Sequence, residues 1–186
     1  MMISDAELIK GCIEGKKDVQ QQLYKKFASS MFGVCLRYFD SREEAEDALQ
    51  EGFIRVFTNL GSFRNEGSLE GWIRRIVVNT ALNQLRNHQK HQHHLDLEEV
   101  ENILSDEADT ISNISREDLL RLLVELPPGY RMVFNLYEIE GYSHKEIAEM
   151  FSISVSTSKT QLLKARKVLQ KKVFDLNKEK LSLEND

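Results

Sequence analysis

The sequence YSHKEIAEMFSISVSTSKTQLLKARKVLQKK, residues 142–172, predicts two helices separated by a tight turn. Ser143 and Glu146 have the S-x-x-E spacing of a capping box, so a first helix should begin there. Ser154 can cap a second helix, which should extend to about Lys172. The Ser152-Ile153-Ser154 stretch between them is too short to be a domain linker. A short helix, a tight turn and a longer helix form a helix-turn-helix.

The second of these helices separates apolar from basic residues. At about 100° per residue, one side carries Leu162, Ala165, Leu169 and Val173. The opposite side carries Thr157, Thr160, Lys164, Lys167 and Lys171, with Ser156 and Gln161 flanking it. Six Lys or Arg and no Asp or Glu occur from Ser156 to Lys172. Such a face suits a DNA major groove. A solvated basic surface is the alternative, and the adjoining helix and turn favour DNA binding.

The composition is that of a helical globular protein. Among 186 residues, 30% are charged, 41% are hydrophobic and only two are proline. Long periodic segments dominate, so we expect an all-α protein. No apolar run approaches the ~18 residues that span a membrane, and the N-terminus does not resemble a signal peptide. We therefore expect no membrane insertion and a cytoplasmic protein, in which Cys12 and Cys35 are buried thiols.

Charge divides the chain into three parts. Residues 1–94 carry 13 basic and 12 acidic side chains, and residues 116–186 carry 12 and 11. Residues 95–115 carry 7 acidic side chains and no basic one. We predict two domains, 1–94 and 115–186, joined by an acidic linker at 95–114. The net charge of −5 predicts weak non-specific affinity for DNA, so another protein should supply much of the binding energy.

Three helix starts are predicted in the first domain. Ser4 and Glu7 form a capping box, Asp18 and Gln21 have a similar spacing, and Ser41 with Glu44 should begin a third helix. That third helix begins with Glu43, Glu44, Glu46, Asp47 and Glu51, opposed only by Arg42. Five carboxylates exceed what the helix dipole favours, so we infer a basic protein partner. Catalytic carboxylates are the alternative, but no His, Ser or metal-like spacing accompanies them.

The next helix should follow a Gly/Ser/Asn-rich loop at residues 61–68 and begin near Leu69. Asn79, Asn83 and Asn87 recur every four residues and therefore lie on one side of it. Its predicted apolar face contains Trp72, Ile73, Ile76, Val77, Thr80, Ala81 and Leu85. Arginine, asparagine and one tryptophan suit the binding of an unpaired base. A solvated polar stripe is the alternative.

The remaining signals concern a histidine tract and the second domain. His88, His91, His93 and His94 could bind a metal, but no Cys or acidic-His pair frames them. Further on, Ser115 and Asp118 should cap a helix. Pro128 should begin the next one, residues 128–140, and Gly141 should end it.

Two segments together resemble one protein family. They are EEAEDALQEGFIRVFTNLGSFRNEGSLEGWIRRIVVNTALNQLR, residues 43–86, and LPPGYRMVFNLYEIEGYSHKEIAEMFSISVSTSKTQLLKARKVL, residues 126–169. They are similar to the sigma-2 and sigma-4 domains of the extracytoplasmic-function (ECF) sigma factors, the small initiation subunits of bacterial RNA polymerase. With the flanking helices the resemblance covers nearly the whole chain. It implies an all-α fold of two small domains joined by the acidic linker.

The resemblance also implies roles for individual residues. Core polymerase would bind Glu46, Asp47, Gln50, Glu51 and Phe53. The −10 promoter element would be melted and read by Ser62, Phe63, Arg64, Trp72, Arg74, Arg75, Asn79 and Asn83. Among these, Asn79 matches a residue near the pocket that takes a flipped base. The −35 element would be read by Ser156, Thr157, Lys159, Thr160, Gln161, Lys164 and Lys167.

The chain departs from the family pattern in its second domain. Ser156 stands where Gly is frequent, and Lys159, Gln161 and Lys164 stand where Arg is common. Ser158 stands where an apolar residue is usual, at the edge of the core face. A buried hydroxyl at that position would need a hydrogen-bond partner.

We therefore expect a sigma factor of ECF type. It should be no enzyme, need no cofactor or metal, and bind core RNA polymerase, promoter DNA and an anti-sigma factor. A stand-alone helix-turn-helix regulator is the main alternative; such proteins commonly dimerise, and no heptad stripe is present. A metal-dependent enzyme that uses the histidine tract is a third possibility.

Overall fold

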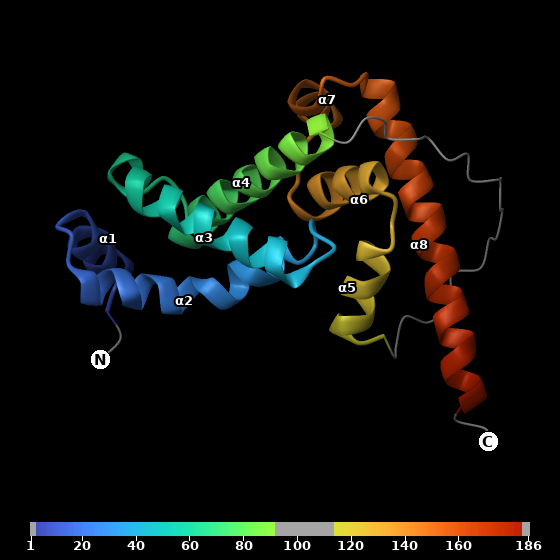
Figure 1. Ribbon diagram of the computed structural model, residues 1–186, viewed down its shortest axis with the longest axis horizontal. Helices are drawn as coiled ribbons and strands as arrows, with labels where there is room; N and C mark the ends of the chain where they lie inside the picture. The colour runs from blue at the N-terminus through green and yellow to red at the C-terminus, as the bar shows by residue number, and fades with distance from the viewer. Residues whose placement is uncertain (1–2, 92–113, 184–186) are drawn as a thin grey trace. The chain divides into compact units, whose positions relative to one another are not determined.

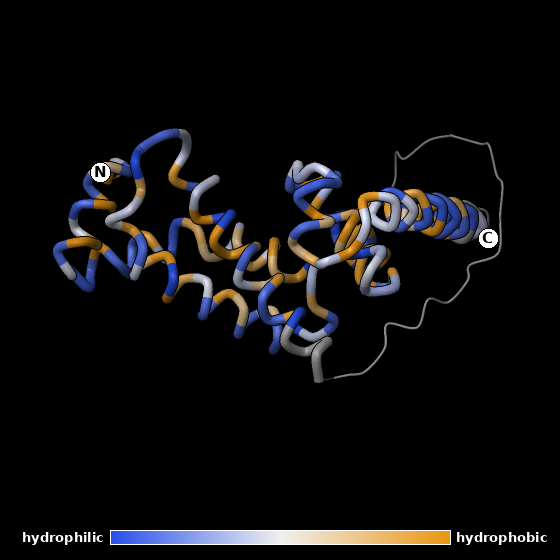
Figure 2. The backbone as a smooth tube through the Cα atoms, turned by 90° about the horizontal axis from the view of Figure 1, so that it is seen from above, coloured by the Kyte–Doolittle hydropathy of each residue, from blue (hydrophilic) through white to orange (hydrophobic). Residues whose placement is uncertain are grey.

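The computed structural model describes residues 3–91 and 114–183. The chain divides into two compact units, Met1–His94 and Leu95–Asp186, and each is considered by itself. Helices labelled α1 to α8, with no strand, make up the regular structure of the described residues (Figure 1). The all-α prediction is therefore confirmed. Apolar and polar residues alternate along these helices (Figure 2). No described helix is both long and apolar enough to cross a lipid bilayer.

The first unit contains α1 (Asp5–Ile13), α2 (Lys17–Cys35), α3 (Arg42–Asn59), the 3₁₀ turn η1 (Leu60–Ser62) and α4 (Leu69–His91). Ser4 and Glu7 form the predicted capping box, and the Ser41 hydroxyl accepts a hydrogen bond from the Glu44 N–H at 3.1 Å. The predicted start at Asp18 is wrong. Helix α2 begins at Lys17, and Lys16 precedes it without a side-chain cap. Asp18 lies inside the first turn, where its charge suits the helix dipole.

Helix α4 packs against both α2 and α3, and this widens its buried face. Ile73, Val77 and Ala81 are buried as predicted, but Val78 and Leu82 are buried as well. By contrast, the predicted core residues Trp72, Ile76 and Leu85 are only half-buried. At the crossing with α3, a Cβ on Gly52 would lie 3.1 Å from Cγ2 of Val77. The absence of that side chain lets the two helices approach closely.

The second unit contains α5 (Arg116–Val124), α6 (Pro128–Phe134), the π-helical turn η2 (Asn135–Ile139), α7 (His144–Phe151) and α8 (Val155–Leu183). The capping boxes at Ser115 and Ser143 are present as predicted. Pro128 begins α6, and Gly141 follows η2 with φ +76°. The predicted single helix 128–140 is therefore divided: its second half widens into η2.

Helices α7 and α8 form the predicted helix-turn-helix. Ser152 ends α7 in the left-handed conformation, φ 54°, and the Ser154 hydroxyl caps α8 by accepting the Thr157 N–H at 2.9 Å. Helix α8 continues to Leu183, well past the predicted end near Lys172. Lys172 and Lys180 each make a 2.6 Å ion pair with α5, to Glu125 and Asp118 respectively. The extension is therefore held by contacts with a helix far away in sequence.

Ser158 lies inside the core and not at its edge. Its side chain is fully buried, and its hydroxyl lies 3.0 Å from Nδ1 of His144 in α7. The His144 ring stacks on Tyr137, with centroids 4.3 Å apart. Burial, helped by the charges of Lys159 and Arg166, lowers the pKa of His144, so the ring is neutral at pH 7. The hydrogen-bond partner that a serine needs at this position is thus His144.

Replacement of Ser158 by Ala should destabilise the second unit. The change leaves Nδ1 of His144 without its partner inside the motif, which costs about 1–2 kcal/mol of unfolding free energy. Hydrogen exchange of the α7 and α8 amides measures this loss for the second unit alone. Lys171→Ala, at an exposed position of the same helix, should change protection little. Equal effects of the two variants would contradict a structural role for the Ser158–His144 contact.

Asp118 should make the stability of the second unit dependent on acidic pH. Its hydrogen bond from Lys180, followed by those from Ser115, lowers the pKa of this carboxyl to about 2. The unfolded value is about 3.9, so the stabilisation is complete above pH ~4 and disappears as the pH falls to ~2.

Denaturant unfolding of Asp118→Asn should therefore show lower stability than the parent at pH 7, with the difference shrinking between pH ~4 and ~2. Glu117→Gln, in the same helical turn, serves as the control. A difference between parent and Asp118→Asn that stays constant over this pH range would contradict the assignment.

Candidate protein and nucleic-acid interfaces

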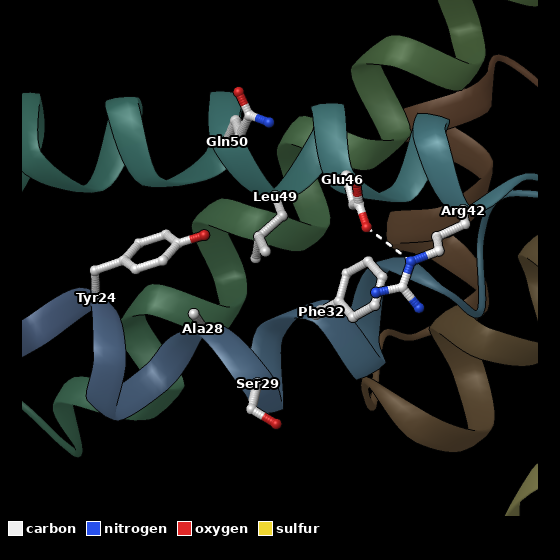
Figure 3. Close-up of a pocket in the computed structure, with 8 residues that line it drawn as sticks. All are labelled: Tyr24, Ala28, Ser29, Phe32, Arg42, Glu46, Leu49 and Gln50. Atoms are coloured by element: carbon white, nitrogen blue, oxygen red, sulfur yellow. Dashed lines mark hydrogen bonds and ion pairs between the residues drawn. The ribbon is translucent and has the colours of Figure 1, made fainter.

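An open groove runs between α2 and α3 in the first unit (Figure 3). Its volume is about 430 Å³. It is lined by Tyr24, Ala28, Ser29, Phe32, Arg42, Glu46, Leu49 and Gln50. The α3 members come from the acidic helix that the sequence singled out. The α2 members come from a helix in which the sequence predicts no binding residue, because nothing local in α2 reveals that α3 leaves part of it uncovered.

Aromatic and charged groups meet at one end of this groove. The Arg42 guanidinium lies over the Phe32 ring, 4.9 Å from the centroid, and its Nε donates to Glu46 at 2.8 Å. The charge of Glu46 is thus largely matched by Arg42 on its own helix. Glu51 is similarly paired with Arg55 at 2.8 Å. Two of the predicted acidic contacts are therefore already engaged in the free chain.

The exposed face of α3 differs from the predicted one in two residues. Asp47 and Gln50 are exposed as a contact would require. Phe53, however, is only 2% exposed and packs edge-on against Tyr24, with ring centroids 4.7 Å apart. Its side chain supports the core, as its helical spacing from Leu49 and Val56 predicts, and is not available for the surface contact that the resemblance implies. Ile54 is 60% exposed and was missed, although helical spacing places it beside Gln50.

The loop after α3 is joined to the start of α4 by two aromatic rings. Phe63 and Trp72 are half-buried, and their centroids lie 5.4 Å apart. Ser62 and Arg64 are exposed, with the Ser62 hydroxyl donating to the Asn59 carbonyl at 2.7 Å. The predicted −10 residues of the loop are thus held near the first turn of α4.

One stripe of α4 carries the polar residues predicted to read unpaired bases. Arg75 and Asn79 are exposed, whereas Arg74 and Asn83 are half-buried. Asn83 accepts a hydrogen bond from Arg86. By helical spacing Arg75, Asn79 and Asn83 share a side with Trp72. The side chains of Asn87, His88, His91, His93 and His94 lie outside the described residues.

The predicted −35 residues on α8 do not all have the same exposure. Ser156, Lys159 and Thr160 are exposed, and Thr157, Lys164 and Lys167 are half-buried. Thr157 takes part in the helix cap, its hydroxyl 2.8 Å from that of Ser154.

Two other residues of α8 change this predicted face. Gln161 is half-buried and lies against Gly129 of α6: a Cβ there would be 3.1 Å from its Nε2. Leu163 is 54% exposed and was missed, although helical spacing places it between Lys159 and Lys167. An apolar side chain of this kind suits a thymine methyl group.

The thiols and clustered ligands give no sign of a reactive centre in the described part of the chain. Burial raises the pKa of the Cys35 thiol to about 12 and also raises that of Cys12, so both are protonated at neutral pH. No group of three or more His, Cys, Asp or Glu is arranged to hold a metal among the described residues.

Two family models match the chain in the order that the two units require. Sigma-70 region 2 matches residues 23–91, and sigma-70 region 4 matches residues 116–169. Together the two matches span about two thirds of the chain.

Several curated proteins are similar over almost their whole length. The ECF RNA polymerase sigma-E factor of Haemophilus influenzae is 28% identical over 185 residues, covering 94% of this chain and 97% of the relative. The RNA polymerase sigma-H factor of Pseudomonas aeruginosa is 28% identical over 186 residues, covering 94% and 96%. The ECF sigma factor SigW of Bacillus subtilis is 28% identical over 181 residues, covering 90% and 96%.

A solved structure has the same fold. It is the sigma factor RpoE of Bartonella quintana, crystallised with the anti-sigma factor NepR, with a TM-score of 0.51 and 19% identity. The match covers 82% of this chain and 95% of that one. The family matches, the full-length relatives and the shared helical fold agree: the chain belongs to the sigma-70 family and is a transcription initiation factor of the ECF group.

Proposed function

We propose that the two units divide the work of a sigma factor among three surfaces. The exposed face of α3 and the α2–α3 groove bind core RNA polymerase, the loop and polar stripe of α4 read the −10 element, and α8 reads the −35 element. The order of the two sigma-70 matches along one chain carries this proposal. We place the domains at 1–94 and 115–186, with 95–114 connecting them.

The polymerase contact is supported by the unpaired part of the acidic face. Asp47 and Gln50 are exposed beside the apolar side chain of Ile54, whereas Glu46 and Glu51 are matched by arginines of α3. A basic partner helix with an apolar side could use both the charge and the groove. Phe53 acts beneath this surface by supporting it from the core.

Promoter melting is supported by the polar stripe on α4. An exposed asparagine beside arginine and a half-buried tryptophan offers hydrogen bonds and a stacking surface to an unpaired base. Base unstacking costs a few kcal/mol, and such contacts offset it. Melting would then be driven by binding energy, without nucleotide hydrolysis. We accordingly propose that the chain itself is not an enzyme and acts in the cytoplasm.

An anti-sigma factor is the third proposed partner. The solved relative from Bartonella quintana was crystallised with one, and this chain shares its fold. The stand-alone regulator is not favoured, because full-length relatives are named sigma factors and because that role would leave the acidic face of α3 unused. Tight duplex binding by the isolated chain is the result that would revive it.

Asp47→Lys should weaken binding to core polymerase by about ten-fold, because it reverses an exposed charge at the proposed contact. Glu46→Lys is a less specific test of this contact, because it would also remove the ion-pair partner of Arg42. Fluorescence anisotropy of the labelled chain titrated with core enzyme measures the affinity. Asp175→Lys, at an exposed position of α8, provides the matched charge reversal. Equal affinities for the two variants would count against α3 as the docking surface.

Asn79→Ala should impair promoter opening about ten-fold while core binding stays unchanged, since it removes a side chain that can hydrogen-bond an unpaired base. Permanganate reactivity of unpaired thymines reports opening, and the anisotropy assay reports assembly. Gln22→Ala, an exposed amide on α2, is the control. If Asn79→Ala lowered opening and assembly equally, Asn79 would have a structural role instead.

A further inference from the structure

Helices α6 and α8 approach each other at a position where α6 has no side chain. Gly129, the second residue of α6, is buried. A Cβ placed on it would lie 3.1 Å from Nε2 and 3.6 Å from Cδ of Gln161. The Gln161 amide therefore occupies space into which a long side chain at position 129 would extend, whereas an alanine Cβ would need the amide to shift by only a few tenths of an ångström.

This packing leaves part of the amide unsatisfied. In the described part of the chain, Oε1 of Gln161 is buried and has no hydrogen-bond partner. A buried acceptor without a donor is unfavourable, whereas the same amide turned outward could bond to water or DNA. The inward position is therefore maintained by the available space beside Gly129 and not by a hydrogen bond.

The consequence concerns the surface that α8 presents. Ser156, Lys159 and Thr160, in the preceding turn and a half, are exposed. Glutamine is a residue type that recognises adenine through a pair of hydrogen bonds in the major groove. An amide packed against α6 cannot make such a pair, so Gln161 does not act as a reader while it stays inward.

We propose that Gly129 is a specificity-determining residue of this chain, because the space it leaves holds Gln161 off the DNA-reading face of α8. The proposal rests on the assignment of α8 as the reader of the −35 element. It predicts that a substitution in α6, away from the recognition helix, changes which promoter bases are preferred.

The test compares the parent chain, Gln161→Ala, Gly129→Leu and the double variant, each assembled with core polymerase. Transcription from a promoter library randomised at the −35 element is read by sequencing. Gln161→Ala should leave the ranking of −35 sequences unchanged. Gly129→Leu should push the amide outward and create a preference for adenine at one position of about five-fold or more, the discrimination of one good side chain–base contact. The double variant should lose this new preference.

Two outcomes would overturn the proposal. One is a change of about five-fold or more in −35 preference caused by Gln161→Ala alone. The other is a new adenine preference of Gly129→Leu that persists in the double variant. Gln170→Ala, an exposed amide on α8, controls for general effects of losing a glutamine. A parent holoenzyme indifferent to the −35 sequence would refute both the reading role of α8 and the specificity role of Gly129.

A measurement on the full free chain tests the packing separately. In NMR spectra of the parent, the Gln161 side-chain amide should show a nuclear Overhauser contact to the Gly129 α-protons, and Gly129→Leu should abolish the inward position. Absence of the contact in the parent would refute the packing. This measurement and the Gln161→Ala library both remain decisive should Gly129→Leu fail to fold.

Discussion

The burial of one side of each long helix is the constraint on which the rest of this protein depends. Helices α3, α4 and α8 each place an apolar side in a core, so only the opposite arc of each is free to bind a partner. Where two helices must come very close, as at Gly52 and Gly129, a side chain is absent. The proposed binding surfaces are the helix faces that this packing leaves exposed to solvent.

The exposed faces of the helices differ in charge. This difference explains how a DNA-binding protein can carry a net charge of −5. Acidic residues gather on α3, and lysines gather on α8. Within the first unit, Arg42 and Arg55 of α3 pair with Glu46 and Glu51 of the same helix. A basic partner on α3, as proposed, would leave the lysines of α8 available to contact phosphates.

The second unit shows how polar residues can hold a small motif together. Ser158 and His144 join the two helices of the helix-turn-helix from inside, and the ion pairs from Lys172 and Lys180 hold the long end of α8 against α5. The first contact replaces apolar packing by a satisfied hydrogen bond. The Lys172–Glu125 pair is exposed enough to contribute little by itself. Asp118 is more buried and also accepts a hydrogen bond from the Ser115 N–H, so its pair with Lys180 contributes more.

The sequence by itself determined the helical class, the two homologous segments and nearly every helix start. Capping by Ser4, Ser41, Ser115, Ser143 and Ser154 depends on residues within three positions, so local sequence is sufficient. The helix start predicted at Asp18 is wrong, because a capping pattern alone does not exclude a start at a neighbouring residue. The chain turns into α2 at Gly15, which has φ +74°.

Only the tertiary structure decided the length of α8, the outward position of Ile54 and the inward position of Gln161. The first and last depend on single residues distant in the chain, Asp118 and Gly129, and the position of Ile54 depends on the packing of α2 and α4 around α3. Helical periodicity gives the direction in which a side chain points, but not which residues of other helices pack against it.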